Sequence, residues 1–173
     1  MPLTHILETS RLRLRTLSID DAPFILELVN EPAWLQFIGD RGVRSVEQAR
    51  DYIVKGPMAM FERFGFGLYL TELKDGGVPI GICGLIKRDS LPDVDLGFAF
   101  LPRFWGRGYA REAAAASLAH GLGALGLKRI VAITSPDNQR SIRLLEQIGF
   151  GHERRVALSE GEAEVELFAH PAG

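Results

Sequence analysis

Cysteine is nearly absent from this sequence, which has Cys83 as the only one among 173 residues. A single cysteine excludes a disulfide within the chain and favours a reducing compartment such as the cytoplasm. Long apolar runs are also missing: no stretch is long enough to cross a bilayer, and residues 1–15 contain no apolar core of a signal peptide. We therefore expect a cytoplasmic protein that does not act in a membrane.

A surplus of basic charge is absent as well. The chain has 20 Lys and Arg against 22 Asp and Glu, for a formal net charge of -2, which argues against general nucleic-acid binding. The four histidines lack the spacing of metal ligands, so we expect no metal site. The length suits one domain over residues 1–173, and no repeat or linker divides it.

The apolar pattern predicts an α/β fold, with a mixed, mostly antiparallel sheet of six or seven strands and helices on both faces. Strands are expected at residues 11–15, 66–73, 78–87, 93–101, 129–134, 150–158 and 164–170. Helices are expected from residue 20 or 21 to 30, from 45 to 55 with a further turn toward 63, from 108 to 123 and from 138 to 148.

Capping and turn residues predict where several elements begin and end. Asp20 or Asp21 can cap the first helix, and Pro32 is expected to end it. Ser45 is expected to open the second helix and Pro57 to interrupt it. Residues 74–77 (Lys-Asp-Gly-Gly) predict a hairpin turn, because Asp-Gly and Gly-Gly tolerate positive φ.

Residues 105–112 (Trp-Gly-Arg-Gly-Tyr-Ala-Arg-Glu) are the most informative segment. They join an alternating apolar strand to an alanine-rich helix that begins near Gly108. Two glycines let the backbone approach a ligand closely, and the free N–H groups of a helix start favour a phosphate. Arg103, Arg107 and Arg111 add positive charge nearby. Taken alone, the segment could also be a tight strand-to-helix connection that binds nothing.

Five segments share their order and spacing with a known family. They are residues 8–15 (Glu-Thr-Ser-Arg-Leu-Arg-Leu-Arg), 95–98 (Asp-Leu-Gly-Phe), 105–113, 137–141 (Asp-Asn-Gln-Arg-Ser) and 146–150 (Glu-Gln-Ile-Gly-Phe). Together they resemble the GCN5-related N-acetyltransferase (GNAT) superfamily, most closely its RimJ/RimL-like branch of ribosomal-protein N-terminal acetyltransferases. The resemblance implies the acyl-CoA N-acyltransferase fold and transfer of an acetyl group from acetyl-CoA to an amine.

The resemblance also implies where acetyl-CoA binds. Its pyrophosphate would lie on the backbone N–H groups of Gly106, Arg107, Gly108, Tyr109, Ala110 and Arg111. Arg107 or Arg103 would supply side-chain charge, since Trp105 stands where the superfamily often has Gln or Arg. The pantetheine arm would lie between the splayed strands at 93–101 and 129–134 and pair with the backbone of Phe98, Ala99, Phe100 and Leu101. The amide of Asn138 would also bond this arm, although Asn138 could equally be the N-cap of its helix.

The same resemblance implies two candidate catalytic residues, Asp95 and Ser141. Asp95 occupies a position where relatives often have glutamate, and it would act as general base directly or through a water. Ser141 would lie near the CoA sulfur and donate to the leaving thiolate, unless it is only a surface serine. Relatives often have a general-acid tyrosine near the helix after Asn138, but residues 144–146 are Leu-Leu-Glu. That absence leaves Ser141 or water as the acid.

The acceptor site is less well defined by the sequence. Trp34 and Phe37 are core residues or, by family analogy, walls of the acceptor pocket, with segment 154–166 as a possible other wall. Asp93 shares the strand face of Asp95 and is either part of this site or a solvated strand end. We expect the acceptor to be an α-amine of a protein or peptide, or a small-molecule amine. A homodimer is plausible by resemblance.

Three other functions stay open at this point. The chain could be a non-catalytic acyl-CoA-binding or regulatory module, or a protein-interaction domain without cofactor binding. It could also transfer a larger acyl group such as succinyl, because Gly97 and Ala99 are small. Cys83 has apolar neighbours and is expected to be a buried core thiol.

Overall fold

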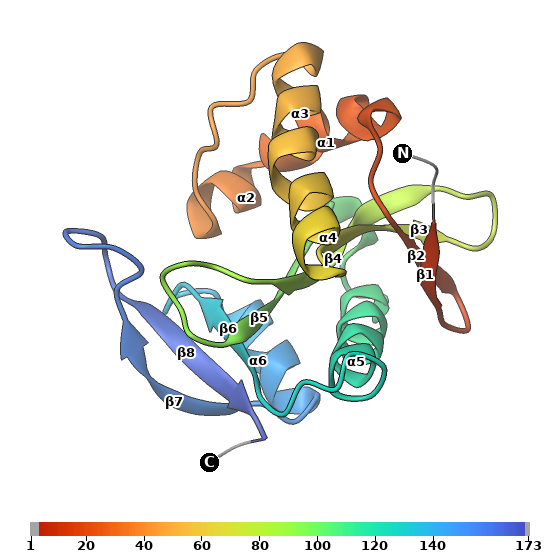
Figure 1. Cartoon of the computed structure of the whole chain (residues 1–173). Helices are drawn as coiled ribbons and strands as arrows, with labels where there is room; N and C mark the ends of the chain where they lie inside the picture. Colours follow the sequence, from red (N-terminus) through yellow and green to blue (C-terminus); the bar gives the residue numbers. More distant parts are fainter. Residues whose placement is uncertain (1–3, 172–173) are drawn as a thin grey trace.

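In the computed structural model, which describes residues 4–171, one eight-stranded sheet carries helices on both faces (Figure 1). The strands follow the order β1-β2-β3-β4-β5-β6-β8-β7. Neighbouring strands are antiparallel except for β5 and β6, which are parallel. The expected mixed, mostly antiparallel sheet is therefore confirmed, with slightly more strands than the six or seven expected.

The additional strand is the short edge strand β1 (His5–Glu8), which was too short to be recognised from its pattern. The others are β2 (Leu12–Arg15), β3 (Leu68–Leu73), β4 (Pro79–Ile86), β5 (Val94–Phe100), β6 (Ile130–Thr134), β7 (Gly151–Val156) and β8 (Val165–His170). The expected turn between β3 and β4 is confirmed, because Gly76 and Gly77 have φ of 82° and 62°.

One face of the sheet is covered by helices from the first third of the chain (Figure 1). They are η1 (Ile19–Asp21), α1 (Ala22–Val29), α2 (Pro32–Phe37), α3 (Val46–Ile53), the π-helical segment η2 (Val54–Met58) and α4 (Ala59–Phe64). Leu28 and Ile53 pack there against Leu70 of β3 and Ile82 of β4, so this layer has a core of its own.

The ends of these helices follow the expectations with added detail. Asp21 is the N-cap residue of α1 but makes no side-chain cap bond, and the capping box lies one step earlier, where the Ser18 hydroxyl accepts from the Asp20 N–H and the Asp21 carboxylate accepts from the Ser18 N–H. The first helix ends before Pro32 as expected, and Pro32 also begins α2, since proline suits the first turn of a helix. Pro57 interrupts the α-helix as expected, through the π-helical turn of η2, and α4 then continues to Phe64.

The opposite face is covered by α5 (Tyr109–Leu122) and α6 (Gln139–Gln147), which follow β5 and β6 (Figure 1). Small residues let α5 lie close to the sheet: Ala113 and Ala114 are fully buried, and a Cβ at Gly121 would meet Ile130 Cδ1 at 2.6 Å. Leu145 of α6 joins the same core. This close packing holds the first turn of α5 against the end of β5.

The parallel pair β5–β6 is the feature that positions the site. It is joined only at Val94–Ile130 and Asp95–Val131, and no further residues of the two strands are paired. Beyond Asp95, β5 continues in register with β4 up to Phe100. The strands therefore separate into a V after Asp95 and Val131, and the open end of the V faces the connection to α5.

Candidate active site

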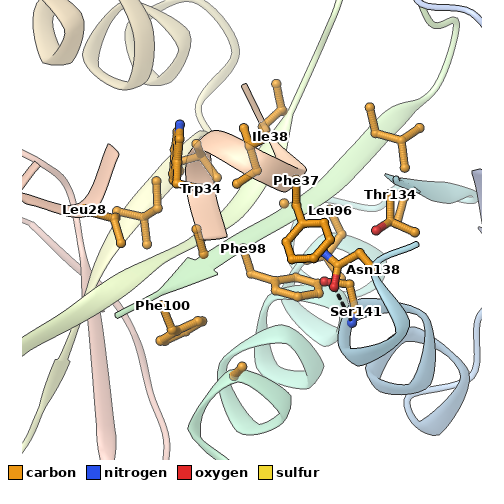
Figure 2. A pocket seen from close by; sticks show the side chains of 18 of the residues that line it. Leu28, Trp34, Phe37, Ile38, Leu96, Phe98, Phe100, Thr134, Asn138 and Ser141 are labelled. Carbon is orange, nitrogen blue, oxygen red and sulfur yellow. Dashed lines mark hydrogen bonds between the residues drawn. The ribbon is translucent and has the colours of Figure 1, made fainter. Parts of the chain in front are cut away.

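A cavity of about 390 Å³ extends through this V and onto the face that carries α1–α4 (Figure 2). Its walls include Leu96, Gly97, Phe98, Ala99 and Phe100 of β5 and Ala132, Ile133 and Thr134 of β6. The start of α6 closes one end, while α2, α3 and η2 contribute to the other. One continuous space therefore connects the two faces of the sheet at the point where its strands separate.

Nine of the residues singled out in the sequence line this cavity. They are Trp34, Phe37, Asp95, Phe98, Ala99, Phe100, Ala110, Asn138 and Ser141. The cavity lining does not include Asp93, Leu101, Arg103, Gly106, Arg107, Gly108, Tyr109 or Arg111. No residue of segment 154–166 lines it either, among the residues that the structure describes. Residues 106–108, between β5 and α5, form an exposed turn outside the cavity.

That turn has the backbone expected of an anion site. Gly106 and Gly108 adopt φ of 79° and 83°, and Gly108 is the N-cap of α5 without a side-chain cap bond. The first helical bond runs from the Glu112 N–H to the Gly108 carbonyl. Within residues 4–171, the N–H groups of positions 106–111 therefore have no protein acceptor. These groups and the helix dipole favour an anion.

The charges around the turn differ from those expected. Arg103 is engaged elsewhere, with its Nη1 2.7 Å from Glu27 Oε2 of α1. Arg11 reaches the turn instead, donating from Nη1 to the Arg107 carbonyl at 2.9 Å and from Nε to Glu112 Oε1 at 2.9 Å. Its guanidinium also stacks over the Tyr109 ring, 4.5 Å from the centroid. Arg11 belongs to segment 8–15, so the signal was present, but its partner lies about a hundred residues away.

Trp105 and Arg140 close the cavity near the turn. The Trp105 Nε1 donates to the Phe100 carbonyl at 2.9 Å, and the Arg140 guanidinium lies 4.3 Å from the centroid of the Trp105 ring. The Leu101 N–H donates to the Ile80 carbonyl, and its side chain is fully buried. Alternate residues of β5 direct their backbone groups toward β4, as Leu101 does. The N–H and carbonyl of Phe98 and the N–H of Phe100 therefore point the other way, toward the open V.

Asn138 and Ser141 lie together at the start of α6 (Figure 2). Asn138 is the N-cap, and its Oδ1 accepts from the Ser141 N–H at 3.3 Å. The capping role considered from the sequence is thus confirmed, and the Nδ2 donor is left over for another partner. Both residues line the cavity on the side where β6 ends.

Asp95 is the buried charge of the cavity, with 1% of its surface exposed. Desolvation raises the pKa of Asp95 to about 6, against the lowering effect of Arg88. The Arg88 Nε lies 3.3 Å from both carboxylate oxygens, yet it donates only to Oδ2, and Oδ1 has no hydrogen-bond partner. Asp95 thus presents a free acceptor atom, unlike Asp93, which lies outside the cavity and bonds Arg129 at 3.0 Å.

The other end of the cavity is formed largely by side chains that the sequence did not single out. Trp34 is both a core residue and a cavity wall, and Phe37 is a half-buried wall beside it (Figure 2). Tyr52, Arg41 and Arg88 also line this end. Burial raises the pKa of Tyr52, although the positive charges of Arg41 and Arg88 act in the opposite direction.

None of the helices in the described part of the chain is both long and apolar enough to span a membrane. Within residues 4–171, no three His, Cys, Asp or Glu side chains are grouped so that they could hold a metal ion. Cys83 is buried, and burial raises the pKa of its thiol to about 12, which confirms the expected core position.

Comparison with known proteins identifies the family. The family model described as "Acetyltransferase (GNAT) domain" matches residues 11–151. The chain belongs to the GNAT acetyltransferase family. The uncharacterized N-acetyltransferase YoaA of Bacillus subtilis is 31% identical over 86% of this chain and 84% of its own. The acyltransferase activity expected from the sequence is thereby confirmed at the level of the family.

Solved structures of this acetyltransferase family share the fold. An acetyltransferase from Agrobacterium tumefaciens str. C58 is 27% identical, with a TM-score of 0.81 over 98% of this chain and 94% of its own. RimL, a ribosomal L7/L12 α-N-protein acetyltransferase solved in complex with coenzyme A, has a TM-score of 0.82 at 20% identity over 98% of each chain. The second likeness concerns the fold alone.

Proposed function

We propose that this enzyme transfers an acetyl group directly from acetyl-CoA to a primary amine, without an acyl-enzyme, and that residues 1–173 act as one GNAT domain. The observation that carries the proposal is the position of Asp95. Asp95, which keeps one carboxylate oxygen without a hydrogen-bond partner, lines a cavity that extends from the side of the 106–111 turn to the apolar wall formed by α2. A donor and an acceptor substrate can therefore approach the same buried base from opposite faces of the sheet.

The donor end fits acetyl-CoA, which supplies the acetyl group as a thioester. The N–H groups of residues 106–111 can bind its pyrophosphate, with each charge-assisted bond contributing about 1.5–3 kcal/mol. The backbone of Phe98 and the free Nδ2 of Asn138 can bond the amides of the pantetheine arm. This path would bring the thioester to Ser141 and Asp95, which line the same cavity.

Asp95 and Ser141 have different roles in the transfer. Asp95 removes a proton from the neutral acceptor amine, directly or through a water, as the amine nitrogen forms its bond to the acetyl carbon and the carbon–sulfur bond breaks. The Ser141 hydroxyl donates a hydrogen bond to the departing sulfur, and solvent supplies the final proton. A base with a pKa of about 6 is well matched to this task near neutral pH.

An α-amine is the less demanding acceptor. At pH 7, removing a proton from a free lysine costs about 4.6 kcal/mol, against about 1 kcal/mol for an α-amine. Holding both substrates in the cavity can contribute about 7–11 kcal/mol, so positioning outweighs the base. The buried, unpaired Cys83 agrees with a cytoplasmic location for the enzyme.

Titration calorimetry with acetyl-CoA, CoA and succinyl-CoA tests the donor site. Gly108→Trp should abolish micromolar acetyl-CoA binding, because position 108 has φ of 83° and an added Cβ would lie 3.3 Å from Arg11 Nη2. Gly126→Trp is the matched control, since Gly126 has φ of 66° with open space around it. A preference for succinyl-CoA would contradict the proposal that acetyl is the group transferred. Absence of binding to all three compounds would contradict the proposal that the protein is an acyl-CoA-dependent enzyme.

Release of the CoA thiol, followed with a thiol reagent, then tests the acceptor. Peptides with free N-termini, lysine derivatives and small amines should be compared at equal concentration. We expect transfer to at least one class of α-amine, with the acetylated product verified by mass spectrometry. Binding of acetyl-CoA without turnover of any amine would instead favour a non-catalytic acyl-CoA-binding module.

A further inference from the structure

The acceptor end of the cavity combines an apolar wall with two guanidinium groups. The apolar wall comes from Trp34 and Phe37 of α2 and from Pro57 and Met60, which belong to η2 and α4. Such a wall suits an aromatic or branched side chain, because flat apolar surfaces on both sides can bury it from water. The acceptor is thus expected to carry an apolar body beside its amine.

Two guanidinium groups, from Arg41 and Arg88, lie at this end near the Tyr52 hydroxyl. Asp95 is their only carboxylate partner among the described residues, and it bonds Arg88 alone. Glu31 also lines the cavity as its second carboxylate and makes no ion pair with Arg41 or Arg88 within residues 4–171. The exposed Arg41 and the partly buried Arg88 can therefore both bind an anionic group of a ligand at this end.

The geometry places the anion-binding edge of Arg88 close to where the amine would bind. Asp95 Oδ1 has no donor, so it can accept from the amine nitrogen. The Arg88 Nε lies 3.3 Å from that same oxygen, while its two Nη groups have no acceptor within residues 4–171. Groups bound to Oδ1 and to the Nη edge at about 3 Å each would lie a few ångströms apart. One small molecule can present both.

Building on the proposed function, we propose that the acceptor is an amine that carries a carboxylate close to its amino group and an apolar or aromatic side chain. Arg41 and Arg88 bind the carboxylate, with the Tyr52 hydroxyl as a further donor, while Asp95 binds the amine. The same chemistry is available from a free amino acid and from a peptide N-terminus with an acidic second residue. A polycationic amine would meet two arginines and be rejected.

The test compares matched acceptors under saturating acetyl-CoA. Phenylalanine, its neutral amide and 2-phenylethylamine share an aromatic side chain and differ in the carboxylate. Dipeptide amides of phenylalanine with glutamate or glutamine in the second position separate the peptide source from the free amino acid. We expect kcat/KM for the carboxylate-bearing member to exceed its neutral match by about 10- to 100-fold, as for a charge-assisted bond. The ammonium group of phenylalanine amide loses its proton more easily than that of phenylalanine. Chemical reactivity alone would therefore favour the amide over the free amino acid.

Arg41→Gln should remove most of this preference for the carboxylate. It should leave acetyl-CoA affinity unchanged, because Arg41 belongs to the acceptor end of the cavity and not to the donor end. Arg50→Gln, on the exposed surface of α3, is the matched control and should keep the wild-type ratio. The same acceptors should be titrated into the enzyme saturated with CoA, so that binding is measured apart from turnover.

Equal or better use of the neutral amines by the wild type, or an unchanged ratio in Arg41→Gln, would overturn the inference. Absence of both turnover and binding of every carboxylate-bearing acceptor would do the same. These outcomes are distinct from failure of the proposed function, which would appear as absence of acetyl-CoA binding or of transfer to any amine.

Discussion

The two ends of the cavity are built in different ways. The donor end depends on backbone: two glycines with positive φ and the free N–H groups of one helix start, all within residues 105–112. The acceptor end depends on side chains from α2, α3 and the connections around them, which are brought together by folding. A backbone site tolerates changes in most side chains, whereas a side-chain site can acquire a new specificity through one or two substitutions.

The largest expected effect is at the point where the two ends meet. Asp95→Asn keeps the size of the side chain but removes the base, so kcat/KM should fall by about 10²–10⁴-fold. Acetyl-CoA affinity should stay near the wild-type value, because the donor end is formed by other groups. A loss of less than threefold would mean that positioning alone sustains the reaction.

The pH profile of the same variant sharpens this test. Asp95 must be ionised and the amine neutral, so log kcat/KM should rise with a slope near two below pH about 6 and near one above it. Asp95→Asn should show only the shallower slope. The raised pKa also predicts a pH-dependent stability. The contribution of Asp95 to the free energy of unfolding is fully present when the pH is below the pKa of this residue in the unfolded chain, and it is lost as the pH rises through about 6. Thermal unfolding across that window should be flatter in the variant.

Asn138 caps α6 and is proposed to bind acetyl-CoA, and two substitutions can separate these roles. Asn138→Asp keeps the acceptor that caps α6 but lacks the Nδ2 donor, so acetyl-CoA affinity should fall by about tenfold with little change in stability. Asn138→Ala should additionally lower the free energy of unfolding by about 0.5–2 kcal/mol. Calorimetric binding and chemical denaturation measure the two effects. Equal acetyl-CoA binding by wild type and Asn138→Asp would leave Asn138 as a cap only.

Arg11 tests whether the backbone end needs support from outside its own segment. Arg11→Gln removes the bonds to the Arg107 carbonyl and Glu112 and should weaken acetyl-CoA binding by about three- to tenfold. The amine KM should not change. Arg13→Gln, in the adjoining strand β2 with partners in Glu8 and Glu72, is the control. A turn that binds equally well without Arg11 would be self-sufficient.

A shift in pH dependence is expected from the contact between Arg88 and Asp95. Arg88 and Lys87 both lower the pKa of Asp95, so Arg88→Gln should raise it and move the acidic limb of kcat/KM to higher pH. Arg88→Lys keeps a positive charge and should return the limb toward its wild-type position. A limb that does not move in Arg88→Gln would assign the titration to another group.

Much of the fold follows from local patterns that the sequence displays. Alternation predicted β2 to β8, Ser45 correctly predicted the start of α3, and residues 105–112 predicted a turn whose glycines adopt positive φ. The helix boundaries near Asp21, Pro32 and Pro57 also follow from the sequence. Three details of them do not, because each is one of several local geometries available: the capping box at Ser18, the short helix that begins at Pro32 and the π-helical form of the turn at Pro57.

The sequence by itself determined the family, the donor turn and Asp95, because each depends on residues that are neighbours in the chain. Only the tertiary structure decided which charges serve the site. Arg103 lies near the turn in sequence but bonds Glu27, whereas Arg11 reaches the turn from the other end of the chain. Arg41, Tyr52 and Arg88 line one cavity only after α2, α3 and the β4–β5 connection have packed together. Long side chains can reach in many directions, and the packing of distant elements selects one of them.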